Sequence, residues 1–403
     1  MIIAHKIALD LNNKQMTYCQ KAAGTARFSY NWALAEWNAQ YAAWKLDNTQ
    51  VKPSQAALRR QLNAVKREQF PWMLEVTKNA PQMAIIQLGE AFKNFFSGRA
   101  NYPQFKKKGK NHDSFTLTND QFTVKASRIR IPNLGWVRMR ESLRFSGKIL
   151  SATISRIANR WYASISVETE DKSHLPKAEN QGVVGVDLGI KALATLSTGE
   201  IITGAKPLKR LMIKLHRLSR ALSKKIKGSA NRHKAKQKIA RLHARIVFIR
   251  QNSLHQLSSH LTRCFHTIGI EDLNVKGMVK NRKLSRAISD MGFFEFRRQV
   301  EYKATMRGGV VVVADRWFAS SKRCSTKNCG FKADSLPLSV REWRCPQCQT
   351  VHQRDQNAAI NLANYAVSST VSVCGAEGSG SSRKTRTKPA AVKQKINTKA
   401  TYR

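Results

Sequence analysis

Hydrophobic positions follow two different periods along the first half of the chain. Residues 20–46, the stretch after Pro53 and residues 82–96 carry apolar residues at the spacing of amphipathic helices. Residues 115–170 instead alternate apolar and polar positions between turn residues, as strands do. The pattern therefore predicts three helices followed by a compact β unit.

The first residues are expected to complete this β unit. IAHKIAL, residues 3–9, would supply a strand that the unit lacks. Residues 1–19 and 101–178 then form one β-barrel-like unit, and residues 20–100 are a helical insertion within it. The polar segment 171–181 is expected to be a linker.

The second half alternates buried strands with helices. Strands are expected in residues 182–200, 267–274 and 308–315, and helices in residues 206–261 with a break near Gly228, in residues 293–306 and in residues 355–366. Such alternation indicates an α/β core, which we assign to residues 182–320 and 350–367. Residues 368–403 are rich in Ser, Gly and Lys and are expected to form a disordered basic tail.

The charge of the chain is strongly positive and unevenly distributed. Its 403 residues include 71 Lys and Arg against 25 Asp and Glu, a formal net charge of +46. Between Glu200 and Glu271 there are 17 basic residues and no acidic one. An ordinary solvated face normally mixes both signs. This segment is therefore expected to follow the phosphates of a nucleic acid.

Association with a membrane is not expected. The longest uninterrupted apolar run is Val310–Ala314, far short of the roughly 20 residues that span a bilayer. The start of the chain lacks a long apolar stretch, so no secretory signal is expected. Seven cysteines in a chain of this length do not make a disulfide framework. We therefore expect a cytoplasmic protein.

Three acidic residues lie where their carboxylates favour divalent metal binding. Asp187 in VVGVDLG and Glu271 in TIGIEDL each lie on a strand, on the face that carries small residues. Asp355 begins the last helix. A buried carboxylate costs free energy unless it is paired or binds a cation, and Mg²⁺ prefers oxygen ligands. Two such ions roughly 4 Å apart can drive phosphodiester hydrolysis.

Other roles for these acids stay open on pattern alone. Asp187 precedes Leu-Gly and could form a turn, and Asp355 could cap its helix. Asp272 competes with Glu271, although alternation turns it to the opposite face, and Asp315 closes a strand. The order of strand with Asp, hairpin, helix, strand with Glu, strand and helix with Asp suits an RNase H-like core. This order favours the catalytic interpretation, although a fold does not by itself fix a function.

Four cysteines have the spacing of a zinc site. They are Cys324, Cys329, Cys345 and Cys348, in the pattern C-x4-C, 15 residues, C-x2-C. Four thiolates suit tetrahedral Zn²⁺, and a closed shell of sulfur leaves no open position for catalysis. His352 is a spare ligand in this arrangement. The remaining cysteines, Cys19, Cys264 and Cys374, are expected to be ordinary thiols.

Several of these segments together resemble one family. GTARFSYNWAL, AFKNFF and NYPQFKKKGK are similar to its N-terminal half, and IPNLGWVRMR and GKILSATISRIANRWYASISVE to its β unit. GVDLGIKALATLSTG, KKIKGSANRHKAKQKIARLHARI, IGIEDLNVKGM and CPQCQTVHQRDQNAAINL are similar to its nuclease half. The family is TnpB, the RNA-guided nucleases of insertion sequences, which are related to type V CRISPR effectors.

The resemblance implies a multidomain α+β protein. An RNase H-like (RuvC-type) α/β nuclease core would carry an inserted zinc module at residues 321–349. An N-terminal β-barrel-like wedge unit would carry the helical insertion, as a recognition part. The Asp-Glu-Asp triad of the family falls on Asp187, Glu271 and Asp355. Its zinc module falls on the four cysteines.

The resemblance also implies an activity and its partners. The family cleaves double-stranded DNA beside a short target-adjacent motif, uses a guide RNA from the transposon end, and favours retention of the transposon. The implied cofactors are two catalytic Mg²⁺ ions, one structural Zn²⁺ ion and the guide RNA. The sequence departs from the family pattern in its x4 cysteine spacing and in Gln353 and Gln356, where the family often has acids.

Two groups of residues are expected to contact nucleic acid. Phosphates of the guide or heteroduplex are expected at Lys224, Lys225, Lys227, Arg232 and Lys234. Lys78, Gln82 and Thr116 lie in segments that resemble the motif-reading region of the family, and Gln can pair with adenine. An ordinary polar surface role is at least as good an interpretation for each of these three.

Two other functions are carried as alternatives. A three-carboxylate DNA transposase shares the RNase H-like core, and it would bind transposon ends and transfer strands without RNA. A non-catalytic nucleic-acid-binding regulator would need no triad, which is intact here. The leading interpretation is an RNA-guided DNA endonuclease, expected in the prokaryotic cytoplasm and associated with the nucleoid when bound to DNA.

Overall fold

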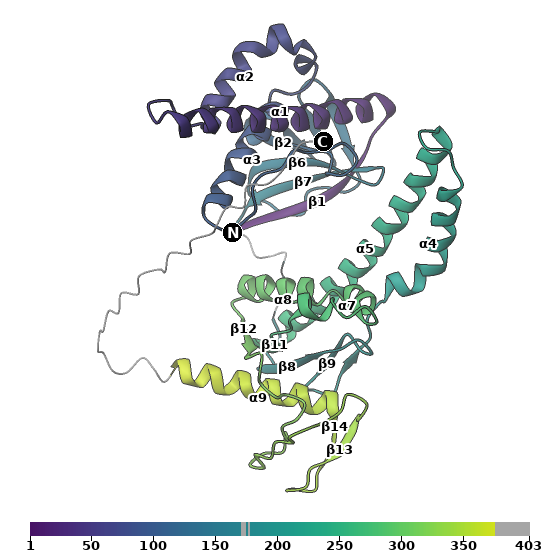
Figure 1. The fold of residues 1–403 in the computed structure, drawn as a ribbon. Coiled ribbons are helices and arrows are strands. Elements are labelled where there is room, and N and C mark those ends of the chain that lie inside the picture. The colour runs from purple at the N-terminus through teal and green to yellow at the C-terminus, as the bar shows by residue number, and fades with distance from the viewer. Residues whose placement is uncertain (171–174, 176–177, 375–403) are drawn as a thin grey trace. The chain divides into compact units, whose positions relative to one another are not determined.

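The computed structural model describes residues 1–170, 175 and 178–374 of the chain, which form two compact units (Figure 1). The first unit comprises residues 1–180, 204–264 and 274–307. The second comprises residues 181–203 and 265–273 and the described chain from Gly308 onward. The predicted α/β core, residues 182–320, therefore contributes to both units.

The first unit contains a seven-stranded antiparallel sheet in the order β2-β6-β7-β1-β5-β4-β3. The strands are β1 (Ile2–Asp10), β2 (Ser114–Thr118), β3 (Thr123–Lys125), β4 (Arg128–Ile131), β5 (Gly135–Met139), β6 (Lys148–Ile157) and β7 (Arg160–Glu168). β1 pairs with β7 along most of its length and with β5 at its end, so the expected N-terminal strand is confirmed. Strands β2 and β3 lie at the two edges and are joined by the short 3-10 helix η2 (Asn119–Gln121).

Helices α1 (Asn13–Leu46) and α3 (Asn79–Phe96) pack against this sheet, and α2 (Gln55–Gln69) packs against α3. The 3-10 helix η1 (Pro71–Glu75) lies between α2 and α3 in the chain. Helix α1 begins earlier than residue 20 because Asn12 and Gln15 form a capping box that satisfies the first free amides. Trp37 of α1 stacks on Phe92 of α3 with ring centroids 4.1 Å apart. Both rings are buried, as expected for core residues.

The remaining helices of this unit are α4 (Pro207–Ser223), α5 (Ala230–Cys264), α6 (Val275–Met278), α7 (Ser285–Met291) and α8 (Phe293–Arg307). The predicted break near Gly228 is confirmed, because α4 ends before this residue, at Ser223, and α5 begins after it, at Ala230. Asp290 of α7 caps α4: its carboxylate accepts hydrogen bonds from the amides of Leu208 and Lys209, each at 3.1 Å. Arg250 of α5 pairs with the same carboxylate at 3.3 Å.

The second unit contains a five-stranded mixed sheet in the order β10-β9-β8-β11-β12. Its strands are β8 (Val183–Leu188), β9 (Ala194–Leu196), β10 (Ile201–Ile202), β11 (Thr267–Glu271) and β12 (Val310–Ala314). β8, β9 and β10 form an antiparallel meander, whereas β11 and β12 run parallel to β8. Helix α9 (Arg354–Cys374) crosses one face of this sheet (Figure 1).

Between β12 and α9 the chain forms a small loop module with the hairpin β13 (Glu342–Arg344) and β14 (Val351–Gln353). Helix α9 does not end near residue 366, so the prediction that residues 368–374 begin the disordered tail is wrong. The hydroxyls of Ser368, Ser369 and Thr370 donate to carbonyls one turn earlier, at 2.9–3.0 Å, so these polar side chains find their partners within the helix. The rest of the predicted tail, residues 375–403, lies outside the described residues.

No helix in the described ranges is both long and apolar enough to cross a membrane. Most of the predicted linker, residues 171–174 and 176–177, lies outside those ranges.

Candidate active site

Two of the three predicted catalytic acids lie at the same end of neighbouring parallel strands. β8 and β11 pair in parallel with Gly185 opposite Gly269 and Val186 opposite Ile270. Asp187 follows Val186, and Glu271 follows Ile270. Alternation along a strand puts Asp187 on the face of Gly185 and Glu271 on the face of Gly269. Both carboxylates therefore lie on one face of the sheet, at the carboxyl ends of its strands.

The third acid reaches this edge from helix α9. A Cβ atom on Gly185 would lie 1.9 Å from the Ala359 carbonyl oxygen, so the glycine face is the face that α9 covers. Asp355 is the second residue of α9. The structure thus brings Asp355 toward Asp187 and Glu271 from a separate element.

The three carboxylates interact electrostatically. Burial, together with the negative charges of Glu271 and Asp355, raises the pKa of Asp187 to about 8, against the positive charges of Arg354 and Arg341. Burial also raises the pKa of Glu271, against a hydrogen bond from Ser320 that lowers it. Acids held in this way favour a proton or a cation between them. A perturbed group of this kind is a marker of a functional site.

Two side chains that sequence reasoning missed hold these acids. The Ser320 hydroxyl donates to Oε1 of Glu271. The Arg341 guanidinium donates from Nη1 to Oδ1 of Asp355 at 3.2 Å. Ser320 follows β12 and Arg341 lies in the cysteine module. No period or motif in the sequence signals either contact, because each joins segments far apart in the chain.

The competing acids have other partners. Asp272 pairs with Arg316, with Oδ2 and Nη2 2.8 Å apart. Asp315 accepts a hydrogen bond from the Trp317 amide at 2.8 Å and so stabilises the turn after β12. These contacts favour Asp187, Glu271 and Asp355 as the site, in line with the alternation along β11.

Polar residues early in α9 attach the cysteine module to the helix. Arg354 donates to the Pro337 carbonyl at 2.6 Å, and Asn357 donates to the Arg323 carbonyl at 2.7 Å. Asn361, one turn later, donates to the carbonyls of Ser320 and Arg323 at 2.8 and 2.7 Å. The Arg and Asn that flank Asp355 in the sequence therefore position the module.

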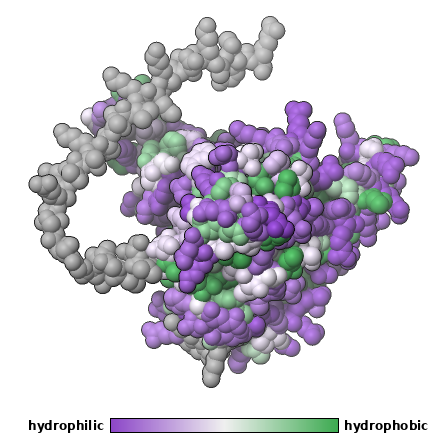
Figure 2. Space-filling model, turned by 90° about the horizontal axis from the view of Figure 1, so that it is seen from below, coloured by the Kyte–Doolittle hydropathy of each residue, from purple (hydrophilic) through white to green (hydrophobic). Residues whose placement is uncertain are grey.

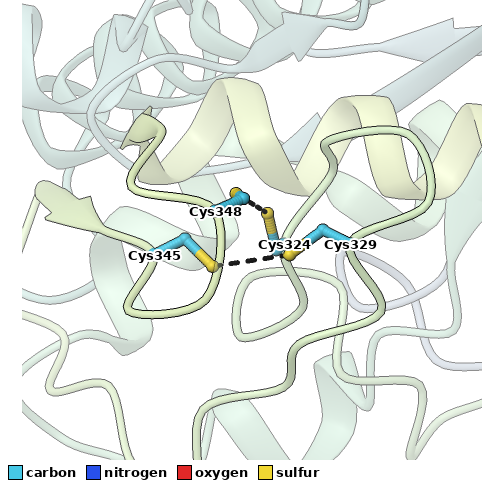
Figure 3. Close-up of side chains that lie close together, drawn as sticks. All are labelled: Cys324, Cys329, Cys345 and Cys348. Carbon is cyan, nitrogen blue, oxygen red and sulfur yellow. Dashed lines mark hydrogen bonds between the residues drawn. The ribbon is translucent and has the colours of Figure 1, made fainter.

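The four predicted zinc ligands converge within that module (Figure 3). Their Sγ atoms all lie within 4.8 Å of one another. Cys324 and Cys348 are 3.6 Å apart, as are Cys329 and Cys345. A tetrahedral Zn²⁺ with Zn–S bonds of about 2.3 Å places its sulfurs about 3.8 Å apart. The cluster therefore fits a metal ion such as zinc, and the x4 spacing does not prevent it.

His352 lies beside this cluster. Its Nε2 atom is 3.0 Å from Sγ of Cys324, and its ring lies 4.9 Å from the Trp343 ring. A histidine in this place can hydrogen-bond a ligating sulfur from outside the shell. Among the described residues, the four cysteines form the group whose metal-ligating atoms all lie within 4.8 Å of one another. The oxygens of the three carboxylates are spaced more widely than this.

The residues predicted to read a target-adjacent motif lie near the start of α3 and on β2. Lys78 is exposed and precedes α3, and Gln82 is half-buried one turn later. Thr116 is buried on β2 and bonds Gln87 of α3 and Thr153 of β6, each at 3.2 Å. Thr116 is thus held among protein partners, whereas Lys78 is accessible.

The predicted phosphate-binding residues surround the turn between α4 and α5. Lys224, Lys225, Lys227 and Lys234 are exposed. Arg232 differs, because its Nη1 donates to the carbonyls of Leu222 and Lys225 at 3.0 and 2.6 Å and so closes the turn. Figure 2 views the molecule from below. Hydrophilic residues cover most of this face, and hydrophobic residues form scattered patches on it.

Three family models match the chain. Residues 164–282 match the model OrfB_IS605, described as "Probable transposase", and residues 293–362 match the Cas12f1-like TNB domain. Residues 1–45 match a model described as a helix-turn-helix domain. The structure has strand β1 and one continuous helix, α1, over those residues.

Curated relatives extend over nearly the whole chain. A Streptomyces pristinaespiralis protein named "Putative RNA-guided DNA endonuclease" is 38% identical over 97% of this chain and 95% of its own. InsQ of Escherichia coli K12, with the same description, is 34% identical over 90% and 92%.

A solved structure, titled as a Cas12f1-sgRNA-target DNA complex, aligns at 15% identity with a TM-score of 0.33. The alignment covers 90% of this chain and 99% of that one. The sequence identity to the curated relatives, over nearly the full length of each, shows that this chain belongs to the TnpB family, the OrfB proteins of IS605-type insertion sequences.

Proposed function

We propose that this protein is an RNA-guided endonuclease that cuts double-stranded DNA beside a short target-adjacent motif. The observation that carries the proposal is the convergence of Asp187, Glu271 and Asp355 at one sheet edge, where burial and mutual repulsion raise the pKa of Asp187 to about 8. A set of buried acids costs free energy unless a cation relieves it. The names of the curated relatives support guidance by RNA.

We infer that these three carboxylates hold two Mg²⁺ ions. The donor set fits, because Mg²⁺ takes carboxylate oxygens and completes its shell with water. When bound, the ions would activate water and stabilise the leaving oxygen of a phosphodiester. In this account Ser320 orients the Glu271 carboxylate, and Arg341 holds Asp355 until a cation binds.

The topology supports the proposed domain roles. The five-stranded order β10-β9-β8-β11-β12, with the acids on β8, β11 and α9, suits an RNase H-like (RuvC-type) core. We assign the seven-stranded sheet to the barrel-like wedge unit and helices α1 to α3 to recognition. The four cysteines would hold one structural Zn²⁺ that fixes the module carrying Arg341.

The proposed partners are a guide RNA from the transposon end and target DNA at the nucleoid. We assign guide or heteroduplex phosphates to the turn between α4 and α5, where four lysines are exposed. Lys78 and Gln82 are assigned to the target-adjacent motif. Thr116 would position Gln87 through their hydrogen bond.

The test begins with the RNA that co-purifies when the protein is expressed from its own locus. One discrete RNA with a structured scaffold and a variable flank is expected. That complex should cut a matching duplex in Mg²⁺, and Asp187→Asn, Glu271→Gln and Asp355→Asn should each abolish cutting without loss of RNA. Asp334→Asn, an exposed acid of the same unit, is the control and should cut normally. Cutting by Asp187→Asn at the wild-type rate would refute the assignment.

A three-carboxylate transposase is the second candidate, because the family model matching residues 164–282 is described as a transposase. It requires the same acids but no RNA. Strand transfer of a transposon end by RNA-free protein would favour it over the guided nuclease.

A further inference from the structure

Trp317 is an unusually exposed tryptophan. It is 86% exposed, whereas Trp72 and Trp136 are each 41% exposed and Trp161 is buried. An indole offers a large apolar face, and leaving that face in water forgoes the free energy of burying it. A tryptophan held in solvent is therefore a candidate contact for a ligand with an aromatic face.

The backbone around Trp317 is held in place. Ala314 and Ser320, three residues away on either side, are buried. The Trp317 amide donates to the Asp315 carboxylate at 2.8 Å, and the Phe318 amide donates to the Asp315 carbonyl at 2.9 Å. These contacts make the turn a fixed support for an exposed ring.

The turn is attached at both ends to the candidate active site. Ala314 pairs with Glu271 in the parallel register of β12 and β11. Ser320 hydrogen-bonds the Glu271 carboxylate, and Arg316 pairs with Asp272, the next residue along. Trp317 therefore lies on the short segment between two contacts with Glu271.

The surroundings of this segment suit a polyanion. Phe318 lines a groove of about 780 Å³ beside α9, and its ring packs against Tyr365 with centroids 4.7 Å apart. Arg323 and Lys327 line the same groove, and none of its lining residues is acidic. A single strand offers both components that these side chains recognise, bases for the rings and phosphates for the cations.

We propose that Trp317 is a stacking platform for an unpaired nucleobase of the DNA strand that enters the site of Asp187, Glu271 and Asp355. The inference rests on the proposed function and adds a binding subsite to it. Stacking would hold the strand near the carboxylates without reading its sequence, because every base has an aromatic face.

The test is a binding cycle on the full chain with its guide RNA, in an Asp187→Asn background that leaves the strand uncut. A dye-labelled single-stranded oligothymidine is compared by anisotropy with the same strand made abasic, in salt high enough to screen phosphate contacts. Trp317→Ala should weaken binding of the intact strand about tenfold and leave the abasic strand unchanged. Trp317→Phe should retain most of the affinity.

Leu338→Ala truncates another exposed apolar side chain in the same unit and is the control. It should change the affinity for neither the intact nor the abasic strand. The proposal is overturned if Trp317→Ala leaves the intact-to-abasic affinity ratio unchanged. It is equally overturned if the variant changes only the oligomeric state, which would make Trp317 a protein contact. Failure of the endonuclease proposal is distinct, because it appears as no guide-dependent cutting by wild-type protein whatever the binding cycle gives.

Discussion

Gly185 and Gly269 lie opposite each other on the parallel strands β8 and β11, beneath helix α9. A Cβ atom on Gly185 would lie 1.9 Å from the Ala359 carbonyl oxygen, and one on Gly269 would lie 2.4 Å from that of Leu362. The absence of side chains at both positions lets α9 approach the sheet. This approach brings Asp355 to the strand ends that carry the other two acids.

Gly185→Ala is expected to displace α9 and separate the carboxylates. The new methyl group meets backbone rather than a flexible side chain, so the free energy of unfolding should fall by about 3 kcal/mol, and cutting should fall with it. Gly24→Ala is the control, since its Cβ finds no atom closer than 3.9 Å and alanine favours a helix. Denaturant unfolding and a cleavage assay measure both effects. A Gly185→Ala protein as stable and active as the control would contradict the packing account.

The raised pKa of Asp187 predicts how stability depends on pH without magnesium. Burial and the charges of the two neighbouring acids raise this pKa from 3.8 to about 8, so the folded protein keeps a proton that the unfolded chain has lost. The folded state binds more protons between these values, and the contribution of Asp187 to stability therefore falls as the pH rises from 3.8 to about 8. Asp187→Asn should remove this dependence, and the variant should be more stable than wild type at about pH 8.

Urea unfolding at several pH values checks this prediction, with Asp334→Asn as the exposed control. The buffer should be free of magnesium but contain no chelator, because a chelator would also strip a metal from the cysteines. Adding Mg²⁺ should stabilise wild type and leave Asp187→Asn nearly unchanged. Parallel pH curves for wild type and Asp187→Asn would argue against a strained carboxylate.

The cysteine cluster predicts one tightly bound metal ion per chain. Cys345 is fully buried in it, so Cys345→Ser should lose the metal and loosen the module that carries Arg341. Cys19→Ala, which removes a buried thiol in the other unit, should keep the metal. Elemental analysis of the purified proteins measures the content directly. Equal zinc in the two variants would exclude a four-sulfur site.

Arg341 competes with a cation for Asp355. Its guanidinium lies 3.2 Å from Oδ1, and a partly exposed ion pair of this kind is worth about 0.2–1 kcal/mol. Arg341→Ala should therefore lower the half-saturating Mg²⁺ concentration for cutting by a few-fold. Arg344→Ala removes the same charge from an exposed position nearby and should not lower it. A titration of the cutting rate against the Mg²⁺ concentration measures this midpoint. An unchanged midpoint in Arg341→Ala would mean that Arg341 does not compete with Mg²⁺ for Asp355.

If the exposed lysines around the turn between α4 and α5 bind RNA phosphates, their replacement should change the salt dependence of RNA binding. Replacing Lys224, Lys225, Lys227 and Lys234 with Gln should flatten the slope of log K against log salt by about 3, because each phosphate contact contributes about 0.7–0.9 to the slope. Arg232→Gln should act differently, since its guanidinium closes the turn, and should lower thermal stability more than it changes the slope. A slope unaffected by the four replacements would place the RNA elsewhere.

Parts of the site could be predicted because they follow local rules. Strict alternation identified the face shared by Asp187 and Gly185, and short spacing identified the four cysteines. The spacing of Asn12 and Gln15 also fits a capping box, although the helix was predicted to begin only at residue 20. Ser320 and Arg341 follow no period, because their roles arise from contacts between separate segments.

The end of α9 shows a second limit. A run of Ser, Thr and Val favours other conformations by propensity. The structure nevertheless continues the helix to Cys374, with the hydroxyls of Ser368, Ser369 and Thr370 bonded to carbonyls one turn earlier.

Reprogramming the guide shows whether the RNA directs where the protein cuts. The variable segment of the co-purified RNA is replaced, and the protein is given two plasmids in Mg²⁺, one matching the old guide and one the new. We expect the double-strand cut to move to the new match, beside the same short motif, and to disappear in Asp187→Asn. Cutting that stays at the old site, or that proceeds without RNA, would contradict this expectation.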